Sequence, residues 1–300
     1  MTTQPFDDRD GLIWFNGDLV PWRDAKVHVL THALHYASAV FEGERVYGGH
    51  VFKLTEHSER LAASARTMGF TLPCSVDALD RATETVCKAN GIVDGYVRPV
   101  AWRGSEMMGV SAQTTRINLA IATWPWPSYF SPEARLKGLR LKTAPWRRPA
   151  PDTAPVHAKA AGLYMICTLS KHAVEADGYD DALMLDWRGR IAESTGANIF
   201  LVFGDGRLHT PVPDCFLDGI TRQTVIALAR ARGIDVVERV IMPEELAQAT
   251  EVFLTGTAAE VTPVGSIDDY HYTPGDITTA LIADYAKATT RTTRQTVSAA

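Results

Sequence analysis

Two segments decide how this chain is interpreted: Val156-His157-Ala158-Lys159-Ala160-Ala161-Gly162-Leu163-Tyr164 and Glu193-Ser194-Thr195-Gly196-Ala197-Asn198-Ile199-Phe200. Lys159 has small and apolar neighbours, and a lysine removed from water loses its proton more readily and can form a Schiff base with an aldehyde. Glu193 lies close to a glycine, and a carboxylate placed against a pyridine nitrogen keeps that nitrogen protonated, so that the ring can accept electrons. Lys159 alone is compatible with an ordinary solvated lysine. The two segments together indicate an enzyme that uses an aldehyde cofactor.

The composition is that of a globular protein without a broad positive field. The 300 residues are enough for one large domain or two ordinary ones. Hydrophobic residues make up 46% and charged residues 22%, a balance that suits a chain with a buried core and a charged surface. The formal net charge is -5. Because a polyanion needs a cationic surface, we expect no nucleic-acid partner.

The cysteines and the N-terminus favour the cytoplasm. Cys74, Cys87, Cys167 and Cys215 form no C-x-x-C pair, which suits reduced thiols better than a disulfide framework or a zinc site. Residues 1–5 lack the charged start and apolar core of a secretion signal. No apolar run approaches the length needed to span a membrane. We therefore expect a cytoplasmic enzyme with no membrane partner.

The N-terminal third predicts a small α+β domain over residues 1–123. Asn16-Gly17 lies between two apolar runs and predicts a β-hairpin, because both residues accept a positive φ. Thr55 is expected to cap a helix that runs to about Met68, and Ser75 is expected to cap the next helix.

A proline-rich stretch at 124–132 is expected to connect two domains, because three prolines in nine positions oppose regular structure. A larger domain is expected over residues 133–300. Short strands, among them 139–143 and 198–203, are predicted there between helices, and the last helix is expected at 276–289 with a frayed tail beyond it. The predicted fold class is therefore α+β.

Two segments offer a site for an anion such as a phosphate. Gly219 permits a tight turn before a helix that begins near Thr221, and the first N–H groups of a helix have no partner within it. A capped helix without a ligand is the alternative. Arg60, on the helix after Thr55, can bind a phosphate through two N–H groups. An ion pair with Glu56, one turn earlier, is the alternative there.

Two more segments suit a carboxylate. Thr255-Gly256-Thr257-Ala258-Ala259-Glu260 follows a strand, and its small residues let backbone N–H groups approach a carboxylate or a phosphate. A plain exit from the strand is the alternative. Tyr96 and Arg98 alternate along a strand and so project to one face. That pair suits a substrate carboxylate, with an ordinary exposed sheet face as the competing interpretation.

Other common sites lack their motifs. His28, His32 and His35 are expected to be structural or surface residues, so we predict no metal site. No serine lies in a G-x-S-x-G motif with triad partners, and the glycines form no G-x-G-x-x-G or Walker pattern. A serine triad, NAD and ATP are therefore poorly supported.

Taken together, the chain resembles the branched-chain-amino-acid aminotransferases, members of the fold type IV pyridoxal-phosphate enzymes (the D-amino-acid aminotransferase-like class). The resemblance extends from Ile13 to Val264, and its segments occur in the same order. It implies a small α/β N-terminal domain and a larger pseudo-barrel C-terminal domain, with pyridoxal 5'-phosphate as the cofactor. The segments that carry it are His32–Tyr36, Val40–Gly43, Tyr96–Pro99, Ala158–Ala160, Glu193–Phe200, Gly219–Arg222 and Gly256–Glu260.

The resemblance implies a role for each residue of a cofactor site. Lys159 is similar to the lysine that holds the cofactor covalently and then moves a proton at the substrate's Cα. Glu193 is similar to the partner of the pyridine nitrogen, and Tyr164 to the residue that hydrogen-bonds the ring hydroxyl. The residues that would hold the phosphate are Arg60, Ile220, Thr221 and Thr257.

The resemblance also implies an activity, the reversible transfer of the amino group of Leu, Ile and Val to 2-oxoglutarate. Tyr96, with the amides of Thr257 and Ala258, resembles the site of the α-carboxylate, and Arg98 resembles the residue that receives the distal carboxylate of glutamate. Tyr36 and Val110 would assist from a neighbouring subunit, so a homodimer or a dimer-based oligomer is expected. The other expected substrate-pocket residues are Phe41, Met108, Trp126, Tyr129, Gly196 and Gly256.

Departures from the family pattern leave the preferred amino donor open. Leu163 stands where many relatives have asparagine, Asp218 where proline is usual, and the segment 102–110 has fewer glycines than is common. A D-amino-acid or (R)-amine transaminase, or an aminodeoxychorismate lyase, would keep the fold and change the substrate, but Tyr96-Val97-Arg98 favours the branched-chain group. A binding module without catalysis is the remaining alternative, and the intact Lys159 and Glu193 oppose it.

Overall fold

The computed structural model describes residues 4–126 and 137–297, with residues 291–297 described as backbone only. The described chain divides into two compact units. Unit 1 contains the chain up to Trp126, the short segment Ala158–Gly162 and the end of the C-terminal helix from Thr292. Unit 2 contains Lys137–His157 and Leu163–Arg291. The division expected at 124–132 stays a prediction, and the segment around Lys159 is grouped with the N-terminal residues.

Unit 1 is built on an antiparallel sheet of seven strands, in the order β2-β1-β7-β6-β4-β5, with β3 paired to β6. The predicted hairpin is confirmed, because Asn16 and Gly17 have φ of 52° and 113° and join β1 to β2. The strands are β1 (Leu12–Phe15), β2 (Asp18–Pro21), β3 (Ala39–Phe41), β4 (Glu44–Tyr47), β5 (His50–Val51), β6 (Gly95–Arg103) and β7 (Ile117–Pro125).

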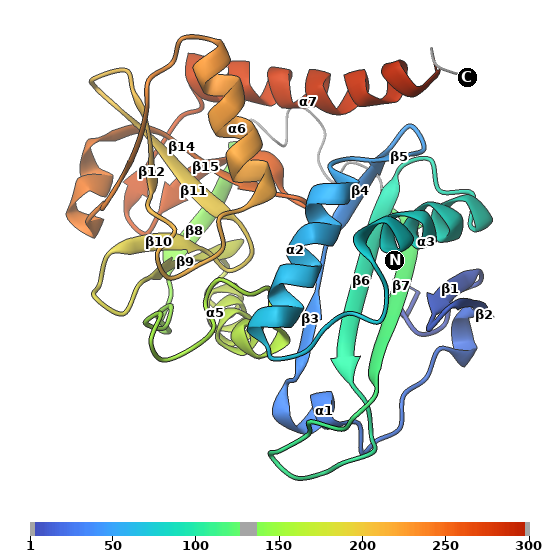
Figure 1. Cartoon of the computed structure of the whole chain (residues 1–300). Coiled ribbons are helices and arrows are strands. Elements are labelled where there is room, and N and C mark those ends of the chain that lie inside the picture. The colour runs from blue at the N-terminus through green and yellow to red at the C-terminus, as the bar shows by residue number, and fades with distance from the viewer. Residues whose placement is uncertain (1–3, 127–136, 298–300) are drawn as a thin grey trace. The chain divides into compact units, whose positions relative to one another are not determined.

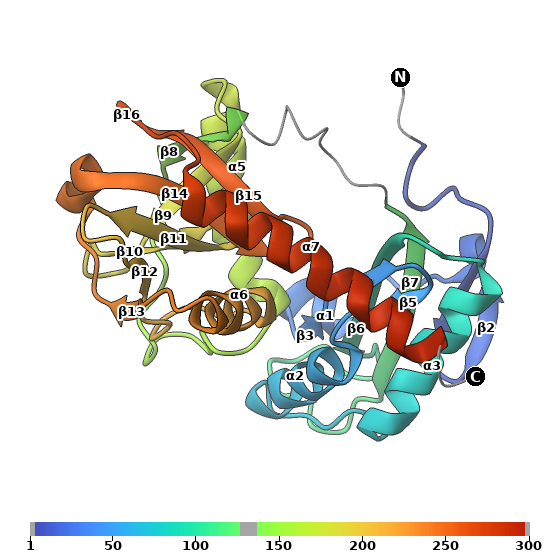
Figure 2. The same cartoon turned by 90° about the horizontal axis from the view of Figure 1, so that it is seen from above.

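Two amphipathic helices, α2 (Leu54–Thr67) and α3 (Val76–Ala89), cover one face of this sheet (Figures 1 and 2). Ser75 caps α3 as predicted, since its side chain accepts a hydrogen bond from the Ala78 N–H. A short helix, α1 (His32–Tyr36), and a 3-10 turn, η1 (Trp22–Asp24), precede β3. The buried core between helices and sheet includes Val40, Val46, Leu61, Leu79, Val86, Val97, Leu119 and Ile121.

Unit 2 is built on a mixed sheet of nine strands, in the order β10-β9-β8-β15-β14-β11-β12-β13, with β16 beside β15. An additional pairing of β10 with β11 closes six of these strands into a ring, which is the barrel-like arrangement expected for the C-terminal half. The strands are β8 (Leu139–Thr143), β9 (Asp181–Leu185), β10 (Ile191–Ser194), β11 (Asn198–Phe203), β12 (Leu208–Pro211), β13 (Val236–Arg239), β14 (Ala249–Gly256), β15 (Glu260–Ile267) and β16 (Tyr270–His271).

The helices of unit 2 pack against the strands of that sheet. The helix α5 contacts β9, and α6 contacts β13 and β14 (Figure 1). None of the helices among the residues that the structure describes is long and apolar enough to cross a bilayer. The helical elements are η2 (Ala161–Leu163), α5 (Tyr164–Ala176), α6 (Ile220–Ala231), η3 (Pro243–Gln248) and α7 (Asp276–Val297).

Several predicted boundaries were wrong for local reasons. Thr55 does not cap α2, because that helix already begins at Leu54 and the Thr55 hydroxyl donates to Asp80 instead. Regular structure does not stop at residue 123, since β7 continues to Pro125, where the end of a strand needs no N–H donor. The last helix continues past 289 to Val297.

The strands β3, β15 and β16 were not predicted. The strand β3 pairs with β6 and β15 pairs with β8, both distant in the sequence, while β16 forms a short hairpin with β15.

Two glutamates, Glu42 and Glu44, lie two residues apart where β3 leads into β4, and both are buried. The Glu44 Oε2 atom has no hydrogen-bond partner among the described residues. Burial raises the pKa of Glu44 well above its usual value, and the nearby charges of Glu42 and Asp80 raise it further. Glu44 is therefore protonated in the folded protein at a pH where the unfolded chain is ionised.

Glu44→Gln is expected to gain stability relative to wild type as the pH rises. Below the usual carboxyl pKa of about 4.3, both the folded and the unfolded wild-type chain hold the proton. Above it the unfolded chain releases the proton and the folded chain does not, so wild type loses about 1.4 kcal/mol per pH unit until the folded pKa is reached. Urea unfolding at pH 5 and pH 7 measures this difference. A stability difference that does not change with pH would contradict the buried neutral carboxyl.

Candidate active site

The backbone of Lys159 is held from both sides within unit 1. Its carbonyl accepts a hydrogen bond from the Phe41 N–H at 3.1 Å, and its own N–H donates to the Ser64 hydroxyl at 3.0 Å. The next residue, Ala160, forms an isolated bridge with Val40. The lysine side chain then lies against an aromatic ring, with its Nζ 5.0 Å from the centre of the Phe41 ring. The backbone of Lys159 is therefore fixed next to β3, and its amine lies beside an apolar ring.

Phe41, Arg98 and Tyr96 lie together with Lys159. The Arg98 guanidinium is 4.8 Å from the centre of the Phe41 ring. Two basic side chains, those of Arg98 and Lys159, therefore lie within 5.0 Å of that ring centre. Arg98 Nη2 donates to the Tyr96 hydroxyl at 3.3 Å, which confirms that these two side chains of β6 project to one face. Gly43 makes room for the tyrosine, because a Cβ there would lie 1.9 Å from the Tyr96 hydroxyl.

Arg60 is held by a buried carboxylate, and the alternative pairing with Glu56 was wrong. The Arg60 Nε and Nη2 donate to the two oxygens of Glu42 at 2.7 and 2.9 Å. Glu56 pairs with Lys53 instead. Burial lowers the pKa of His57 more than its contact with Glu42 raises it, and the charges of Arg60 and Lys159 lower it further. His57 is therefore a neutral neighbour of two cations.

The remaining substrate-pocket residues of unit 1 lie in two places. Trp126 is close to Tyr96, with ring centres 5.3 Å apart. Tyr36, on α1, donates its hydroxyl to the Met108 carbonyl at 3.1 Å, and both side chains are exposed. Val110 is 83% exposed, which is unusual for valine and places it at the molecular surface. The predicted residue Tyr129 lies outside the described residues.

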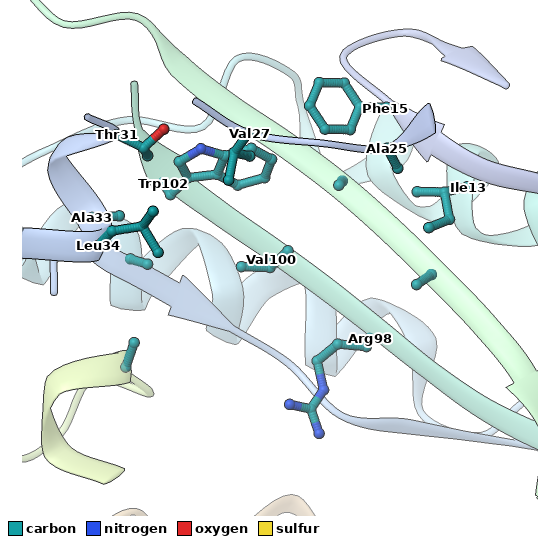
Figure 3. Close-up of a pocket in the computed structure, with 14 residues that line it drawn as sticks. Ile13, Phe15, Ala25, Val27, Thr31, Ala33, Leu34, Arg98, Val100 and Trp102 are labelled. Carbon is teal, nitrogen blue, oxygen red and sulfur yellow. The ribbon is translucent and has the colours of Figure 1, made fainter. Parts of the chain in front are cut away.

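An apolar pocket of about 420 Å³ opens on the face of the sheet opposite α2 and α3. Trp102, Val100 and Arg98 project into it in succession from β6, with Arg98 at one end (Figure 3). Arg98 is the charged residue of a lining that is otherwise apolar except for a threonine. The other lining residues are Ile13, Phe15, Ala25, Val27, Thr31, Ala33, Leu34, Ala39, Ala120, Ala122 and Ala161.

In unit 2, Glu193 is a largely buried carboxylate with two polar neighbours. The Arg148 Nε lies 3.4 Å from Glu193 Oε1, and the Asn198 amide donates to Glu193 Oε2 at 3.2 Å. Burial alone would lower the pKa of the Arg148 guanidinium, but the charge of Glu193 raises it. Arg148 is itself buried. The pair is therefore a cation and an anion removed from water together.

Asn198 also connects Glu193 to the start of α6. Its amide donates to the Leu217 carbonyl at 2.9 Å, and a Cβ on Gly219 would lie 2.3 Å from its Oδ1 atom. Gly219 therefore lets the chain pass close to Asn198 before the helix begins. No side chain caps α6, because its N-cap residue is Gly219, and Asp218, one residue earlier, accepts from Arg222 and Gln223. The first backbone N–H groups of α6, at Ile220 and Thr221, form the kind of helix end that binds anions.

Two glycines predicted at the substrate site come together in the same unit. A Cβ on Gly256 would lie 3.3 Å from the Gly196 carbonyl oxygen. Thr257 and Ala258 follow in the turn that joins β14 to β15. Tyr164 begins α5, in the same unit as Arg148. Unit 2 thus carries Tyr164, Glu193, Gly196, Ile220, Thr221, Gly256, Thr257 and Ala258, and unit 1 carries the other described site residues.

Glu42, His57, Arg148 and Asn198 were missed by the analysis of the sequence. Glu42 and Asn198 lie inside the segments that carry the family resemblance, close to the expected site residues Phe41 and Glu193. Their polar character at those positions was the signal that could have identified them. Arg148 lies in an irregular proline-rich stretch, and nothing in the sequence pointed to it.

The chain matches one protein family over most of its length. The sequence profile of the amino-transferase class IV family matches residues 39–267. The chain is 47% identical over 256 residues to the probable branched-chain-amino-acid aminotransferase of Rickettsia felis, which covers 85% of this chain and 87% of that protein.

Solved structures agree with the sequence match. The T.th. branched-chain amino acid aminotransferase with pyridoxamine 5'-phosphate superimposes with a TM-score of 0.91 at 39% identity and covers 94% of both chains. The same enzyme complexed with N-(5'-phosphopyridoxyl)-L-glutamate gives a TM-score of 0.89 at 38% identity, over 94% of this chain and 95% of that one. These structures confirm a fold type IV architecture for the chain. The chain therefore belongs to the class IV aminotransferases, and among them to the branched-chain-amino-acid aminotransferases.

Proposed function

We propose that this chain is a cytoplasmic enzyme that reversibly transfers the amino group of branched-chain L-amino acids to 2-oxoglutarate, with pyridoxal 5'-phosphate bound at Lys159. The observation that carries the proposal is the cluster in unit 1, where Lys159 Nζ and the Arg98 guanidinium lie against Phe41 and Arg98 contacts Tyr96. An amine, an apolar ring and a carboxylate-binding pair are the groups that this reaction requires. Solved relatives hold pyridoxamine phosphate and a phosphopyridoxyl-glutamate adduct, which supports both the cofactor and glutamate as a substrate.

The polar groups of the two units fit the chemistry of the cofactor. The N-terminus of α6 without a side-chain cap and the Arg60 guanidinium suit a phosphate, with Thr257 as a further donor. Glu193 suits the ring nitrogen because Arg148 favours its ionised form, and Tyr164 suits the ring hydroxyl. When bound, the cofactor supplies a ring that accepts electrons from the substrate's Cα. Lys159 would then take the proton from the substrate's Cα and deliver it to the aldehyde-derived carbon of the cofactor, C4′.

The substrate is oriented by the residues around Phe41. Tyr96 and the amides of Thr257 and Ala258 hold the α-carboxylate, beside the small residues Gly196 and Gly256. Phe41, Met108 and Trp126 are proposed to line the pocket for the side chain, and the family resemblance adds Tyr129. One methylene is worth only about 1–3 kcal/mol in such a pocket, so Leu, Ile and Val are all accepted. Arg98 receives the second carboxylate when glutamate occupies the same pocket.

The purified enzyme is expected to exchange amino groups with both partners of the reaction. L-Leucine should convert the bound cofactor to its amine form, and 2-oxoglutarate should then restore the aldehyde form, each with a change in the cofactor's absorbance. Arg98→Leu should weaken the step with 2-oxoglutarate by roughly tenfold or more, since it removes a charge-assisted hydrogen bond, and should affect L-leucine much less. Conversion by D-alanine or by an (R)-amine without conversion by L-leucine would replace the proposal with the alternative activity.

We further propose that the enzyme is a homodimer, or an oligomer of dimers, in which Tyr36 and Val110 complete the site of a neighbouring subunit. The proposal is supported by the apolar surface around them. Val29 is 70% exposed, Leu34 62% and Val110 83%, and the apolar pocket described above opens on the same unit. Exposed apolar side chains of this kind are common in protein–protein contacts.

Mixing two inactive variants tests this arrangement. Lys159→Ala and Tyr36→Ala should each lose activity alone, and dimers formed by unfolding and refolding them together should regain it, because one of the two sites then has both residues intact. The control mixture combines Lys159→Ala with Arg60→Gln, two residues of the same subunit's site, and should stay inactive. Failure of the first mixture to regain activity, with heterodimers demonstrated by mass spectrometry, would place Tyr36 in its own subunit's site.

A further inference from the structure

The buried carboxylate of Glu42 has four polar contacts, and no function has yet been assigned to it. Its carboxylate is fully buried and accepts from Arg60 Nε at 2.7 Å, from Arg60 Nη2 at 2.9 Å and from the Gly43 N–H at 3.2 Å. It also lies 2.7 Å from His57 Nδ1. These partners come from α2 and from the turn between β3 and β4. A carboxylate with this many donors is held in one orientation.

The charges in this cluster are well defined. Burial would raise the pKa of Glu42, but the Arg60 charge and the hydrogen bonds from His57 and Arg60 bring it well below its usual value. The lowered pKa of His57 keeps its ring neutral, so its Nδ1–H is the donor to Glu42. The cluster is therefore one anion and one guanidinium, joined along the Nε–Nη2 edge of the arginine.

The exposure of the two partners indicates their order. The Glu42 side chain is 0% exposed, while the Arg60 side chain is 18% exposed. The guanidinium therefore lies on the outer side of the carboxylate, and an anion that arrives from solvent meets the arginine first.

We propose that Glu42 is a positioning residue for the cofactor phosphate: it fixes the inner edge of the Arg60 guanidinium, so that the outer edge is directed at the phosphate. This inference rests on the proposed role of Arg60. An arginine side chain has many rotamers, and a phosphate must immobilise it unless the protein has already done so. The carboxylate supplies that order before the cofactor arrives.

An opposite effect of Glu42 is also physically reasonable, and the two effects differ in sign. A carboxylate near a phosphate repels it, so removal of the charge alone would strengthen phosphate binding. Removal of the support for Arg60 would weaken it. We expect the loss of support to dominate, because the Glu42 charge is neutralised by direct contact with Arg60 and lies behind it.

The test compares pyridoxal 5'-phosphate with pyridoxal, which has the same aldehyde and ring but no phosphate. Dissociation constants of both compounds for the cofactor-free full-length enzyme are measured by absorbance titration. The constant for pyridoxal divided by the constant for pyridoxal 5'-phosphate is the ratio that reports how much the phosphate contributes to binding. Glu42→Gln should reduce this ratio by roughly tenfold or more, the scale seen when supporting hydrogen bonds around a bound ion are removed. Its affinity for pyridoxal should change little.

Four further variants interpret the result. Glu44→Gln removes a second buried carboxyl of the same size, two residues away, and should leave the ratio unchanged. Arg60→Gln should reduce the ratio more than Glu42→Gln does. The double variant Glu42→Gln/Arg60→Gln should be no worse than Arg60→Gln, because Glu42 acts through the arginine. Glu42→Asp keeps the charge but shortens the side chain, and serves if Glu42→Gln unfolds, as judged by circular dichroism.

Two results would overturn the inference, and they are distinguishable. An unchanged or increased ratio in Glu42→Gln, with a reduced ratio in Arg60→Gln, would show that Arg60 binds the phosphate without help from Glu42. An unchanged ratio in Arg60→Gln would remove Arg60 from the phosphate site, and with it the reason for positioning it. In that second case the proposed function must find its phosphate contacts at α6 and Thr257 alone.

Discussion

The pairing of Glu193 with Asn198 closes the ring of strands in unit 2, and the site of that unit depends on it. This is the pair through which β10 meets β11. The Asn198 side chain then contacts the Glu193 carboxylate and the Leu217 carbonyl, just before α6 begins. One local contact therefore sets both the position of the carboxylate and the approach to the helix start. A barrel that did not close here would have neither group in place.

Two buried glutamates and a third that is largely buried show how the surroundings of one chemical group set its charge. Glu42 is anionic because Arg60 and His57 surround it, and Glu44 is neutral because it has burial without a cation of its own. Glu193 has the Arg148 guanidinium beside it, at 3.4 Å. In the proposed reaction, an anion supports the cofactor ring at one unit and another anion orders a phosphate-binding arginine at the other. The same residue type performs each task because the neighbouring cation differs.

Features of the fold that depend on neighbouring residues were predictable from the sequence. The Asn16-Gly17 turn, the Ser75 cap and the strands 139–143 and 198–203 were all confirmed, since each is fixed by the backbone preferences and the apolar pattern of a few residues. The α+β class and the family followed from motifs that occur in order along the chain. Lys159 and Glu193 were identifiable in the same way, although their catalytic roles stay predictions.

Features that depend on distant residues were not predictable. The sequence offered Glu56 as the alternative partner of Arg60 because that residue is one helical turn away, while the structure supplies Glu42, 18 residues away, from a turn in the sheet. Arg148 reaches Glu193 from an irregular segment, and β15 finds its place only between β14 and β8. Such contacts are set by the tertiary fold, and a single sequence carries no local signal for them.

The central claim is that the amine of one particular lysine carries the cofactor. Reduction of the purified, cofactor-loaded enzyme with borohydride fixes the linkage, and mass spectrometry of the resulting peptides locates it. The account predicts a phosphopyridoxyl group on Lys159 and on no other lysine. An adduct at a different lysine, or no adduct in an enzyme that has bound its cofactor, would contradict it.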